Sequence, residues 1–355
     1  MKRSSLVSLA VLASAAALVL AGCSGNGDNS KSNSAGKASS KTACVILPDA
    51  ASSPRWENMD RPDLKKALEG AGFKTDIQNA QGDTSKYATI ADQELSQGCG
   101  VMLLVDYNGA GAAVAKKAKA QGIPVIAYDR PISGADYYVS FDNEKVGELE
   151  GQAIVDGLKA ENKDPKTATV VYMGGDPTDG NAKMFHDGAD KVMSEAGIKP
   201  AKEPPGVWDG AKSATNFEQA LTALGGKVDA VWVANDTNAA GVISVLDKNH
   251  LKVPVSGQDA STAGLQNVLL GKQTGTVWKH VPDEAKAASD LAIELLKGKK
   301  PNVDKKLDDG TPYVAVTPVL VGPKDVEKVV QAGDATVSDI CTGAVKAACA
   351  ANGVQ

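Results

Sequence analysis

Short apolar runs rich in Val and Ile alternate with amphipathic stretches from about residue 43 onward. The apolar runs predict strands at 43–47, 73–78, 101–105, 123–127, 137–141, 168–173, 229–234, 253–257 and 275–278. Helical periodicity predicts helices at 62–71, 110–120, 144–158, 182–196, 217–224, 237–249 and 284–296. Strands that are almost wholly apolar are buried on both faces, and their alternation with helices indicates parallel sheets with right-handed crossovers. We therefore expect a doubly wound α/β protein.

The first 23 residues have the pattern of a secretory signal. Lys2 and Arg3 precede an apolar stretch that ends in the sequence LAGC at 20–23. Small residues directly before Cys23 resemble a bacterial lipobox, in which the cysteine is acylated and becomes the new N-terminus. The alternative is an ordinary signal with an incidental cysteine. We expect a signal peptide at 1–22 and a protein that lipidated Cys23 anchors to the outer face of the cell membrane.

The segment that follows is polar and lacks periodicity. Between Ser24 and Lys41 it consists mainly of Ser, Gly, Asn, Lys and Ala, which cannot bury enough apolar surface to offset the entropy of ordering. This composition predicts a flexible, lipidated tether over 23–42. The remainder is long enough for two domains.

Charge and cysteine content narrow the functional class. The chain has 38 Lys and Arg against 43 Asp and Glu and no basic tract, which argues against nucleic acid as a partner. Apart from Cys23 there are four cysteines, and an even number in an oxidising compartment indicates two disulfides. Cys341 and Cys349 are near neighbours, which leaves Cys44 with Cys99. In the usual strand order of this fold, the strands beside Cys44 and Cys99 are parallel neighbours that start at one edge.

Polar side chains follow the predicted strands at their carboxyl ends, where open parallel sheets bind ligands. A helix N-cap would explain any single Asp or Asn at such a place. Together, in two halves of the chain, they predict a rim of donors and acceptors around one cleft. The residues are Asp49, Arg55, Trp56, Asn108, Asp129 and Arg130 in the first half, and Asp176, Asn181, Asn235, Asp236 and Asp259 in the second.

Such a rim suits a sugar, because each hydroxyl both donates and accepts and because the C–H faces pack on aromatic rings. Trp56 and Trp208 lie in polar, loop-like sequences, where a large ring needs something to cover. Trp232 lies inside a predicted strand and is expected in the core. Trp278, at a strand end beside Lys279, fits either role.

Several motifs together resemble one known family. They are YNG at 107–109, AYDRPI at 127–132, SFDNEKVGELEG at 140–151, YMGGDPTDGNAKMF at 172–185, ANDTNAAG at 234–241, SGQDA at 256–260 and TVWK at 276–279. In this order and at this spacing they resemble the D-xylose-binding branch of the ribose/galactose-type periplasmic binding proteins of ABC sugar import. The similarity runs from about Ala43 to Pro318.

The resemblance implies sugar contacts at matching positions, which are Arg55, Trp56, Asp129, Arg130, Asn181, Trp208, Asn235, Asp236, Asp259 and Lys279. Two positions depart from the family pattern. Gly180 stands where the family has the first Asn of an Asp-Asn-Asn stretch, and the spacing around Trp208 differs by about one residue. The tail after Val321 has no counterpart in the family.

The resemblance also implies a periplasmic-binding-protein type I architecture with two lobes. We expect an N-terminal lobe at 43–141 plus 281–317, a C-terminal lobe at 142–280 plus 318–340, and a tail at 341–355. The chain would cross between the lobes at a hinge near 140–142, 280–282 and 317–318. The implied ligand is a monosaccharide, with D-xylose first and glucose, galactose and arabinose as alternatives. The protein is expected to be a monomer. Its implied partners are an ABC permease and ATPase, or alternatively a membrane sensor kinase.

Other uses of the fold fit the sequence less well. Sugar-responsive repressors carry a helix-turn-helix ahead of the first lobe, where this chain has a signal and a tether. An enzyme would need a nucleophile with a base, or a metal cluster. His186, His250 and His280 are isolated in the sequence, and the glycines at 174–175 lack the Lys-Ser/Thr of a phosphate loop. We expect no catalytic residue, no metal and no cofactor.

Overall fold

The early apolar strands pair in parallel to form the first sheet. The computed structural model describes residues 41–355, so the predicted signal peptide, Cys23 and nearly all of the predicted tether lie outside the described residues. The six strands are β1 (Thr42–Leu47), β2 (Lys74–Asn79), β3 (Val101–Leu104), β4 (Val125–Tyr128), β5 (Tyr137–Phe141) and β10 (Tyr313–Val316). Their order is β10-β5-β4-β3-β1-β2, and every pair is parallel.

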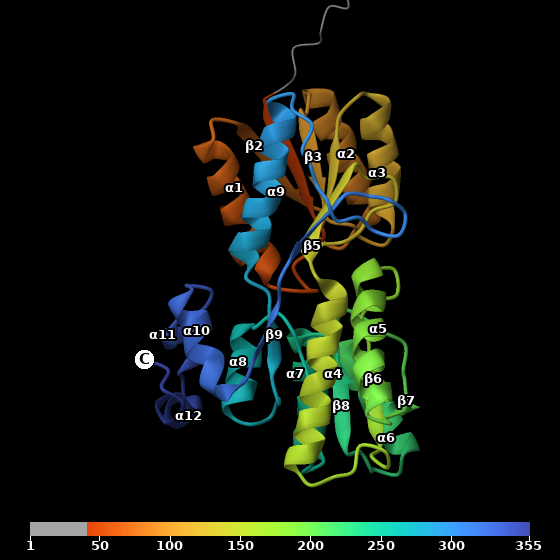
Figure 1. Ribbon diagram of the computed structural model, residues 1–355, viewed down its shortest axis with the longest axis vertical. Coiled ribbons are helices and arrows are strands. Elements are labelled where there is room, and N and C mark those ends of the chain that lie inside the picture. The colour runs from red at the N-terminus through yellow and green to blue at the C-terminus, as the bar shows by residue number, and fades with distance from the viewer. Residues whose placement is uncertain (1–40) are drawn as a thin grey trace, which may run out of the picture. The chain divides into compact units, whose positions relative to one another are not determined.

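Helices cover both faces of this sheet, as a doubly wound fold requires (Figure 1). On one face, α1 (Arg61–Gly70) and α9 (Val281–Leu296) bury residues such as Leu64 and Ala288 against alternate side chains of the strands. On the other face, α2 (Thr84–Gln97) and α3 (Ala110–Ala120) contribute residues such as Ile90 and Val114 to a second apolar cluster. A short π-helix, η1 (Trp56–Asp60), precedes α1. These elements form the N-terminal lobe.

The C-terminal lobe repeats the arrangement around a smaller sheet. β7 (Pro200–Lys202), β6 (Val170–Met173) and β8 (Ala230–Val233) pair in parallel, and β9 (Thr276–Trp278) pairs antiparallel with β11 (Val319–Val321). One face of the lobe is covered by α4 (Asn143–Ala160) and α5 (Gly180–Glu195), the other by α6 (Gly210–Ala223) and α7 (Asp236–Lys248).

The C-terminal segment folds onto this second lobe. α10 (Val326–Gln331), α11 (Val337–Ile340) and α12 (Val345–Asn352) follow the single turn η2 (Pro323–Asp325) and pack against α8 (Thr262–Leu269). Their shared apolar cluster extends to Val354. The end of the chain, expected only as a tail, is therefore part of a packed core.

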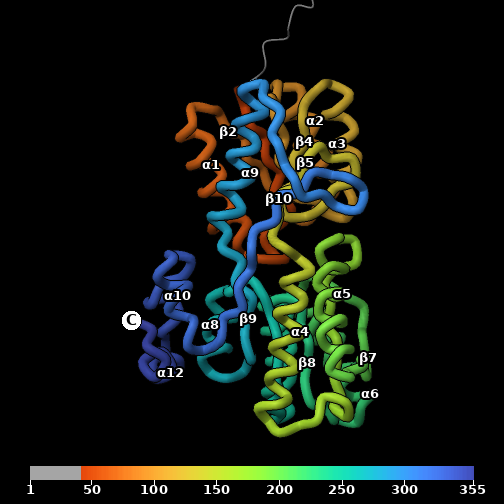
Figure 2. Tube along the Cα trace, viewed as in Figure 1, coloured from red at the N-terminus to blue at the C-terminus, as the bar shows by residue number. Residues whose placement is uncertain are grey.

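Three segments connect the lobes. The chain passes from the first sheet to the second lobe between β5 and α4, returns between β9 and α9, and passes again between β10 and β11. Figure 2 shows the consequence: the late strand β10 lies beside β5, with which it pairs in parallel. The two lobes and the three-segment hinge agree with the predicted fold class.

Most predicted elements are confirmed within a few residues at their ends, except that the helix predicted at 217–224 begins seven residues earlier, at Gly210. The strand expected at 253–257 is wrong, because only Val255 forms a bridge, to Val231. Pro254 lacks an N–H and cannot donate to a ladder. The hydrophobic pattern did not predict α2, whose mostly polar sequence TSKYATIADQELSQ buries only a narrow stripe. It also did not predict α8, the helices after residue 322, or the short strands β7, β10 and β11.

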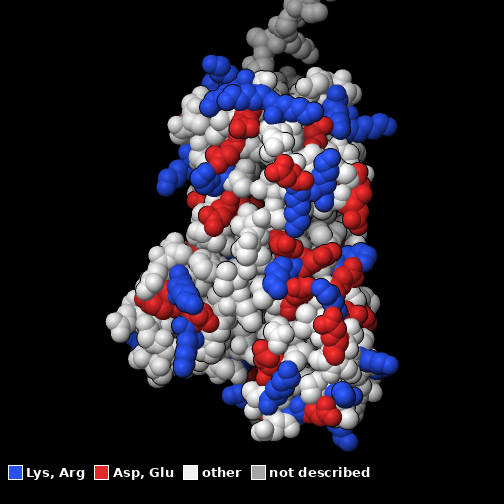
Figure 3. Space-filling model, viewed as in Figure 1, with Lys and Arg blue, Asp and Glu red and all other residues white. Residues whose placement is uncertain are grey.

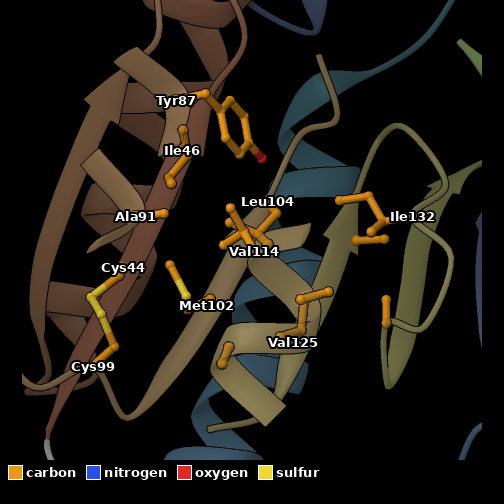
Figure 4. Packing of buried hydrophobic residues seen from close by; sticks show 14 of the residues in the cluster. Cys44, Ile46, Tyr87, Ala91, Cys99, Met102, Leu104, Val114, Val125 and Ile132 are labelled. Atoms are coloured by element: carbon orange, nitrogen blue, oxygen red, sulfur yellow. A yellow bond between two sulfur atoms is a disulfide. The ribbon is translucent and has the colours of Figure 1, made fainter. Parts of the chain in front are cut away.

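Two disulfides join the cysteines in the pairs expected from the sequence. Cys44 on β1 and Cys99 just before β3 have Cα atoms 5.8 Å apart, and Cys341 and Cys349 have Cα atoms 5.9 Å apart. Because β1 and β3 are parallel neighbours, their starting ends lie together, which allows the first bridge. Figure 4 shows this disulfide at the end of the apolar cluster that also holds Met102 and Ile46.

Two further features of the described residues are the apolar character of the helices and the distribution of charge on the surface. Among residues 41–355, no helix combines the length and the apolar character that a membrane span requires. Figure 3 shows acidic and basic side chains interspersed over most of the displayed face. Charge therefore does not mark a docking surface there.

Candidate functional site

A cavity lies between the carboxyl ends of the strands of the two lobes. Its walls are mostly polar, with three aromatic rings. The lining residues are Ser52, Ser53, Arg55, Trp56, Asp129 and Arg130 from the N-terminal lobe, and Asp179, Asn181, Phe185, Trp208, Asn235, Gln258, Asp259 and Lys279 from the C-terminal lobe.

Arg55 is the centre of a buried ion cluster behind the cavity. Its Nε and Nη2 atoms donate to Asp60 over 2.9 and 2.7 Å, Nη2 also donates to Glu284, and Nη1 donates to Asp129 over 2.8 Å. Burial lowers the pKa of Arg55, but these carboxylates outweigh it and hold the pKa above its ordinary value. Four of its five N–H groups are used within the protein, so one remains for a ligand.

Every cation that lines the cavity is paired with a carboxylate that also lines it. Arg55 pairs with Asp129, the Nε atom of Arg130 lies 3.1 Å from Oδ2 of Asp179, and Nζ of Lys279 lies 2.9 Å from Oδ1 of Asp259. Three positive and three negative side chains thus line the cavity in pairs, and Arg55 also faces Asp60 and Glu284 behind it.

The ionisation of these carboxylates depends on how burial and charge compete. Burial raises the pKa of Asp129, but the neighbouring cations, Arg55 foremost, outweigh it and lower the pKa below its ordinary value. Burial also raises the pKa of Asp179, and Arg130 does not fully offset that rise. Burial lowers the pKa of Lys279, whereas Asp259 outweighs it and keeps the lysine pKa above its ordinary value.

Aromatic rings form two walls of the cavity. Trp56 is only 2% exposed and packs into the core under β1 and β3, while its Nε1 donates to Oγ of Ser52 over 3.0 Å. On the opposite lobe, Nε1 of Trp208 donates to Oδ2 of Asp179 over 3.1 Å, and the Trp208 ring meets Phe185 edge-on with centroids 6.4 Å apart. The cavity thus has apolar faces beside its hydrogen-bonding groups.

Two ligand candidates have an unusual backbone. Asp129 and Asp259 have φ angles of 61° and 96°, which non-glycine residues rarely adopt. At Asp129 the carbonyl oxygen accepts from the hydroxyls of Tyr138 and Ser140 over 2.9 and 2.8 Å. These bonds hold the turn after β4 in its unusual conformation, in which Asp129 and Arg130 line the cavity.

Hydrogen bonds cross the cavity between the lobes. Nδ2 of Asn181 donates to the Asp129 carbonyl over 2.7 Å, and Nδ2 of Asn235 donates to the Ser52 carbonyl over 3.3 Å. Oγ of Ser53 donates to Oδ2 of Asp259 over 3.4 Å. The rims of the two lobes are therefore in contact, and the structure represents a closed arrangement.

The structure brings together nine of the ten residues that the resemblance implied as sugar contacts. Asp236 is the exception, because it does not line the cavity. Its carboxylate accepts from Gln273 and Thr276, each over 2.9 Å, and from Ser261, so it fixes α8 and β9. The geometry therefore does not support the sugar contact implied for Asp236, because its oxygens already accept hydrogen bonds behind the cavity.

Five lining residues were not among the contacts expected from the sequence, although three of them had a local signal. Asp179 is the N-cap of α5, accepting from the backbone N–H of Asn181, and Phe185 lies one helical turn after Asn181. Gln258 directly precedes Asp259. Ser52 and Ser53 lie in the loop before Arg55 and carried no distinguishing pattern.

The tryptophans outside the cavity also have defined roles. Trp232 is fully buried and donates from Nε1 to Oε2 of Glu150 over 2.9 Å, as expected of a core residue. Trp278 donates to Oδ2 of Asp334 over 2.7 Å, and His280 approaches the same oxygen at 2.7 Å. Trp278 therefore faces the C-terminal segment near the hinge.

One cluster of possible metal ligands occurs among residues 41–355, formed by Cys44, Glu94 and Cys99. Both sulfur atoms are bonded to each other, so they are not available as thiolates. The cluster lies in the apolar core of the N-terminal lobe, away from the cavity.

Comparison with known proteins decides the family. Residues 44–300 match the model of the periplasmic binding protein domain. The chain belongs to the periplasmic binding protein family. Its two lobes and interlobe cavity are the architecture by which a periplasmic binding protein encloses a small ligand.

Individual relatives of this periplasmic binding protein include proteins named for sugars. The D-xylose-binding periplasmic protein of Escherichia coli (strain K12) is 37% identical over 289 residues, which cover 78% of this chain and 85% of that protein. The multiple sugar-binding periplasmic receptor of Rhizobium radiobacter is 33% identical over 321 residues, covering 82% of this chain and 90% of the receptor.

A solved structure of a sugar-bound solute binding protein is also similar to this chain. The ABC transporter solute binding protein from Clostridium phytofermentans, with bound β-D-glucose, aligns with a TM-score of 0.76 at 26% identity. The alignment covers 84% of this chain and 99% of that one.

Proposed function

We propose that this protein is an extracytoplasmic receptor that binds a neutral monosaccharide in the interlobe cavity and delivers it to an ABC importer. The observation that carries the proposal is the pairing of all six charged lining residues within the cavity. A sugar acid or a sugar phosphate would bring an uncompensated negative charge into a buried site whose lining cations are already paired with carboxylates, at a cost of several kcal/mol. A neutral polyol brings none.

Hydrogen bonding supports the same ligand class. Oε1 of Gln258, a lining residue, is buried and has no hydrogen-bond partner among the described residues. An unpaired buried acceptor is costly, and a ligand hydroxyl would satisfy it. The proposed contacts are Arg55, Asp129, Arg130, Asn181, Asn235, Asp259, Lys279 and Gln258, with the rings of Trp56 and Trp208 facing the sugar.

D-xylose is the first candidate for the ligand. The relative with 37% identity over 289 residues is named for that pentose, and the structural relative with 26% identity holds β-D-glucose. Glucose is therefore the second candidate. The two sugars differ by a hydroxymethyl group, so the room beside C5 of a bound pentose would decide between them.

Closure of the two lobes is the proposed transport signal. We assign 43–141 with 281–317 to the N-terminal lobe and 142–280 with 318–340 to the C-terminal lobe, onto which the segment 341–355 also packs. A sugar that contacts both rims binds the closed form better than the open form, and this difference shifts the population. The importer would then receive loaded protein. A receptor role toward a membrane sensor kinase would use the same closure.

The proposal includes the membrane anchor. The LAGC sequence at 20–23 supports signal cleavage and lipidation at Cys23, which would hold the protein at the outer face of the membrane. A Cys23→Ala variant is expected to be released into the medium or periplasm and to lose incorporation of labelled palmitate. Retention of both label and membrane association by the variant would contradict the anchor.

A thermal-shift panel tests the ligand. D-xylose, D-glucose, D-galactose and L-arabinose would be compared with D-glucuronate and glucose 6-phosphate as charged controls. At one hundred times its dissociation constant, the cognate sugar should stabilise the fold by about 2.7 kcal/mol. It should also lower the radius of gyration in solution scattering. Stabilisation by the charged controls but not by a neutral sugar would contradict the proposal.

A further inference from the structure

At the mouth of the cavity, a proline of one lobe lies against a glycine of the other. Gly180 is the first residue of α5 in the C-terminal lobe, and Pro131 follows Arg130 in the N-terminal lobe. A Cβ atom added to Gly180 would lie 2.6 Å from Cγ and 3.5 Å from Cδ of Pro131. Carbon atoms in favourable contact are about 3.5 to 4 Å apart, so a side chain at position 180 would collide with the proline ring.

Pro131 is held firmly from the N-terminal lobe. On one side of it, the Asp129 carbonyl accepts from Tyr138 and Ser140. On the other side, Ile132 is buried in the apolar cluster between the sheet and α3, against Gly111. The loop therefore cannot withdraw from Gly180 without breaking buried hydrogen bonds or core packing.

Gly180 is held equally firmly from the C-terminal lobe. α5 packs backbone to backbone on α4: a Cβ on Gly147 would lie 2.0 Å from the carbonyl oxygen of Phe185, and one on Gly188 would lie 2.1 Å from that of Glu144. The start of α5 is also tied down by Asp179, which accepts from Asn181 and Trp208. With both backbones held, a collision too large for a change of the Pro131 ring pucker to absorb is relieved by the lobes moving apart.

The contact adjoins the ion pair that closes the cavity. Arg130 and Pro131 meet Asp179 and Gly180, so the 3.1 Å contact between Arg130 Nε and Asp179 Oδ2 and the proline–glycine contact form together. Neither Pro131 nor Gly180 lines the cavity. A substitution at 180 would thus act on the sugar only through the position of its neighbours and the degree of closure.

We propose that Gly180 is a positioning residue whose missing side chain permits full lobe closure against Pro131, and so sets the affinity for the sugar. The expected effect on sugar affinity rests on the proposed function. The contact between Gly180 and Pro131 does not depend on any sugar. A side chain at position 180 destabilises the closed form and leaves the open form unchanged. Affinity therefore falls while the stability of the unliganded fold does not.

The first experiment measures closure without sugar in the full-length mature protein. Oγ1 of Thr178 and Oδ1 of Asn108 are 3.0 Å apart across the cleft mouth, so Asn108→Cys with Thr178→Cys reports the closed form by oxidative crosslinking. Adding Gly180→Val should slow crosslinking at least fivefold. Adding Pro131→Ala as well should restore the rate to within twofold. Gly70→Val is the matched control, because Gly70 is an exposed helical glycine with nothing within 4 Å of its added Cβ.

The second experiment measures D-xylose affinity by calorimetry in the wild-type cysteine background. Gly180→Val should weaken binding at least tenfold with an unchanged melting temperature in the absence of sugar, and Pro131→Ala should rescue it. Gly180→Ala is the milder variant, expected to bind more weakly than the wild type although Ala favours the helix over Gly. Wild-type crosslinking rates and affinities in both Gly180 variants would overturn the inference, as would a loss that Pro131→Ala does not rescue. If the wild type binds none of the sugars, the proposed function fails, and the crosslinking rates still decide the contact.

Discussion

Nη1 of Arg55 donates to Oδ2 of Asp129 over 2.8 Å, and both side chains are buried. The bond joins the loop before η1 to the end of β4. The guanidinium that lowers the pKa of this lining carboxylate also pairs with buried carboxylates of the core. Asp60 and Glu284 face the same guanidinium from η1 and α9. Arg55 therefore both lines the cavity and stabilises the fold of the N-terminal lobe.

Asp129→Ala and Arg130→Ala should weaken sugar binding at least tenfold, since each removes a buried group that a sugar hydroxyl would meet, worth about 1 to 3 kcal/mol. After Asp129→Ala, Arg55 keeps Asp60 and Glu284. Arg55→Met should instead lower the free energy of unfolding by about 3 to 5 kcal/mol, because it leaves a cluster of buried carboxylates unpaired. Calorimetry and urea unfolding would separate the two effects. Unchanged affinity in both cavity variants would remove them from the site.

Trp56→Ala should reduce both stability and affinity, because the ring packs into the core and lines the cavity. The loss of stability should be about 3 to 5 kcal/mol, as for other large-to-small core changes. Trp232→Phe is the control, since Trp232 is fully buried and does not line the cavity. It should lower the melting temperature and leave sugar affinity unchanged. Trp56→Ala with wild-type affinity would show that this ring does not face the ligand.

Glu94 should make stability fall as pH rises. Its side chain is 1% exposed, neither oxygen has a partner among the described residues, and burial raises its pKa from 4.5 to about 9. Between those values the unfolded chain loses the proton that the folded protein keeps, so folding becomes less favourable with increasing pH. Glu94→Gln should match the wild type near pH 4 and exceed its unfolding free energy by more than about 1 kcal/mol at pH 8.

Urea unfolding at several pH values measures this difference. Glu195→Gln, on an exposed position of α5, is the control and should leave the pH profile unchanged. A constant difference between Glu94→Gln and the wild type from pH 4 to pH 8 would contradict the account of Glu94.

The two disulfides should differ in their contribution to stability. The bonded cysteines are 55 residues apart for Cys44–Cys99 and 8 apart for Cys341–Cys349. Loop-closure entropy predicts about 4 kcal/mol for the first and about 2.5 kcal/mol for the second. Double Cys→Ala variants should show this order in chemical unfolding. Peptide mapping of the unreduced protein should find both bridges, and free thiols at Cys44 and Cys99 would contradict the first.

The sequence determined most of the elements and the edge of the sheet where the cavity would be. A short apolar run predicts a buried strand without knowledge of its neighbours. The carboxyl ends of parallel strands lie at one edge of a sheet, independently of the loops that connect the strands. This is why Asp129, Asn181 and Asp259, which are far apart in the chain, were predicted together and do line one cavity. The pairing of Cys44 with Cys99 followed from the same strand order.

Tertiary structure alone decided which polar groups line the cavity and which hold the fold together. Asn235 and Asp236 are adjacent in the sequence, yet one lines the cavity and the other is consumed by Gln273 and Thr276. Side-chain direction at a helix start depends on long-range partners, which local pattern does not encode. The proposed role of Gly180 likewise depends on a long-range partner, because only Pro131 in the other lobe limits the side chain at position 180. A contact between lobes exists only after both have folded and closed, so no local sequence signal can specify it.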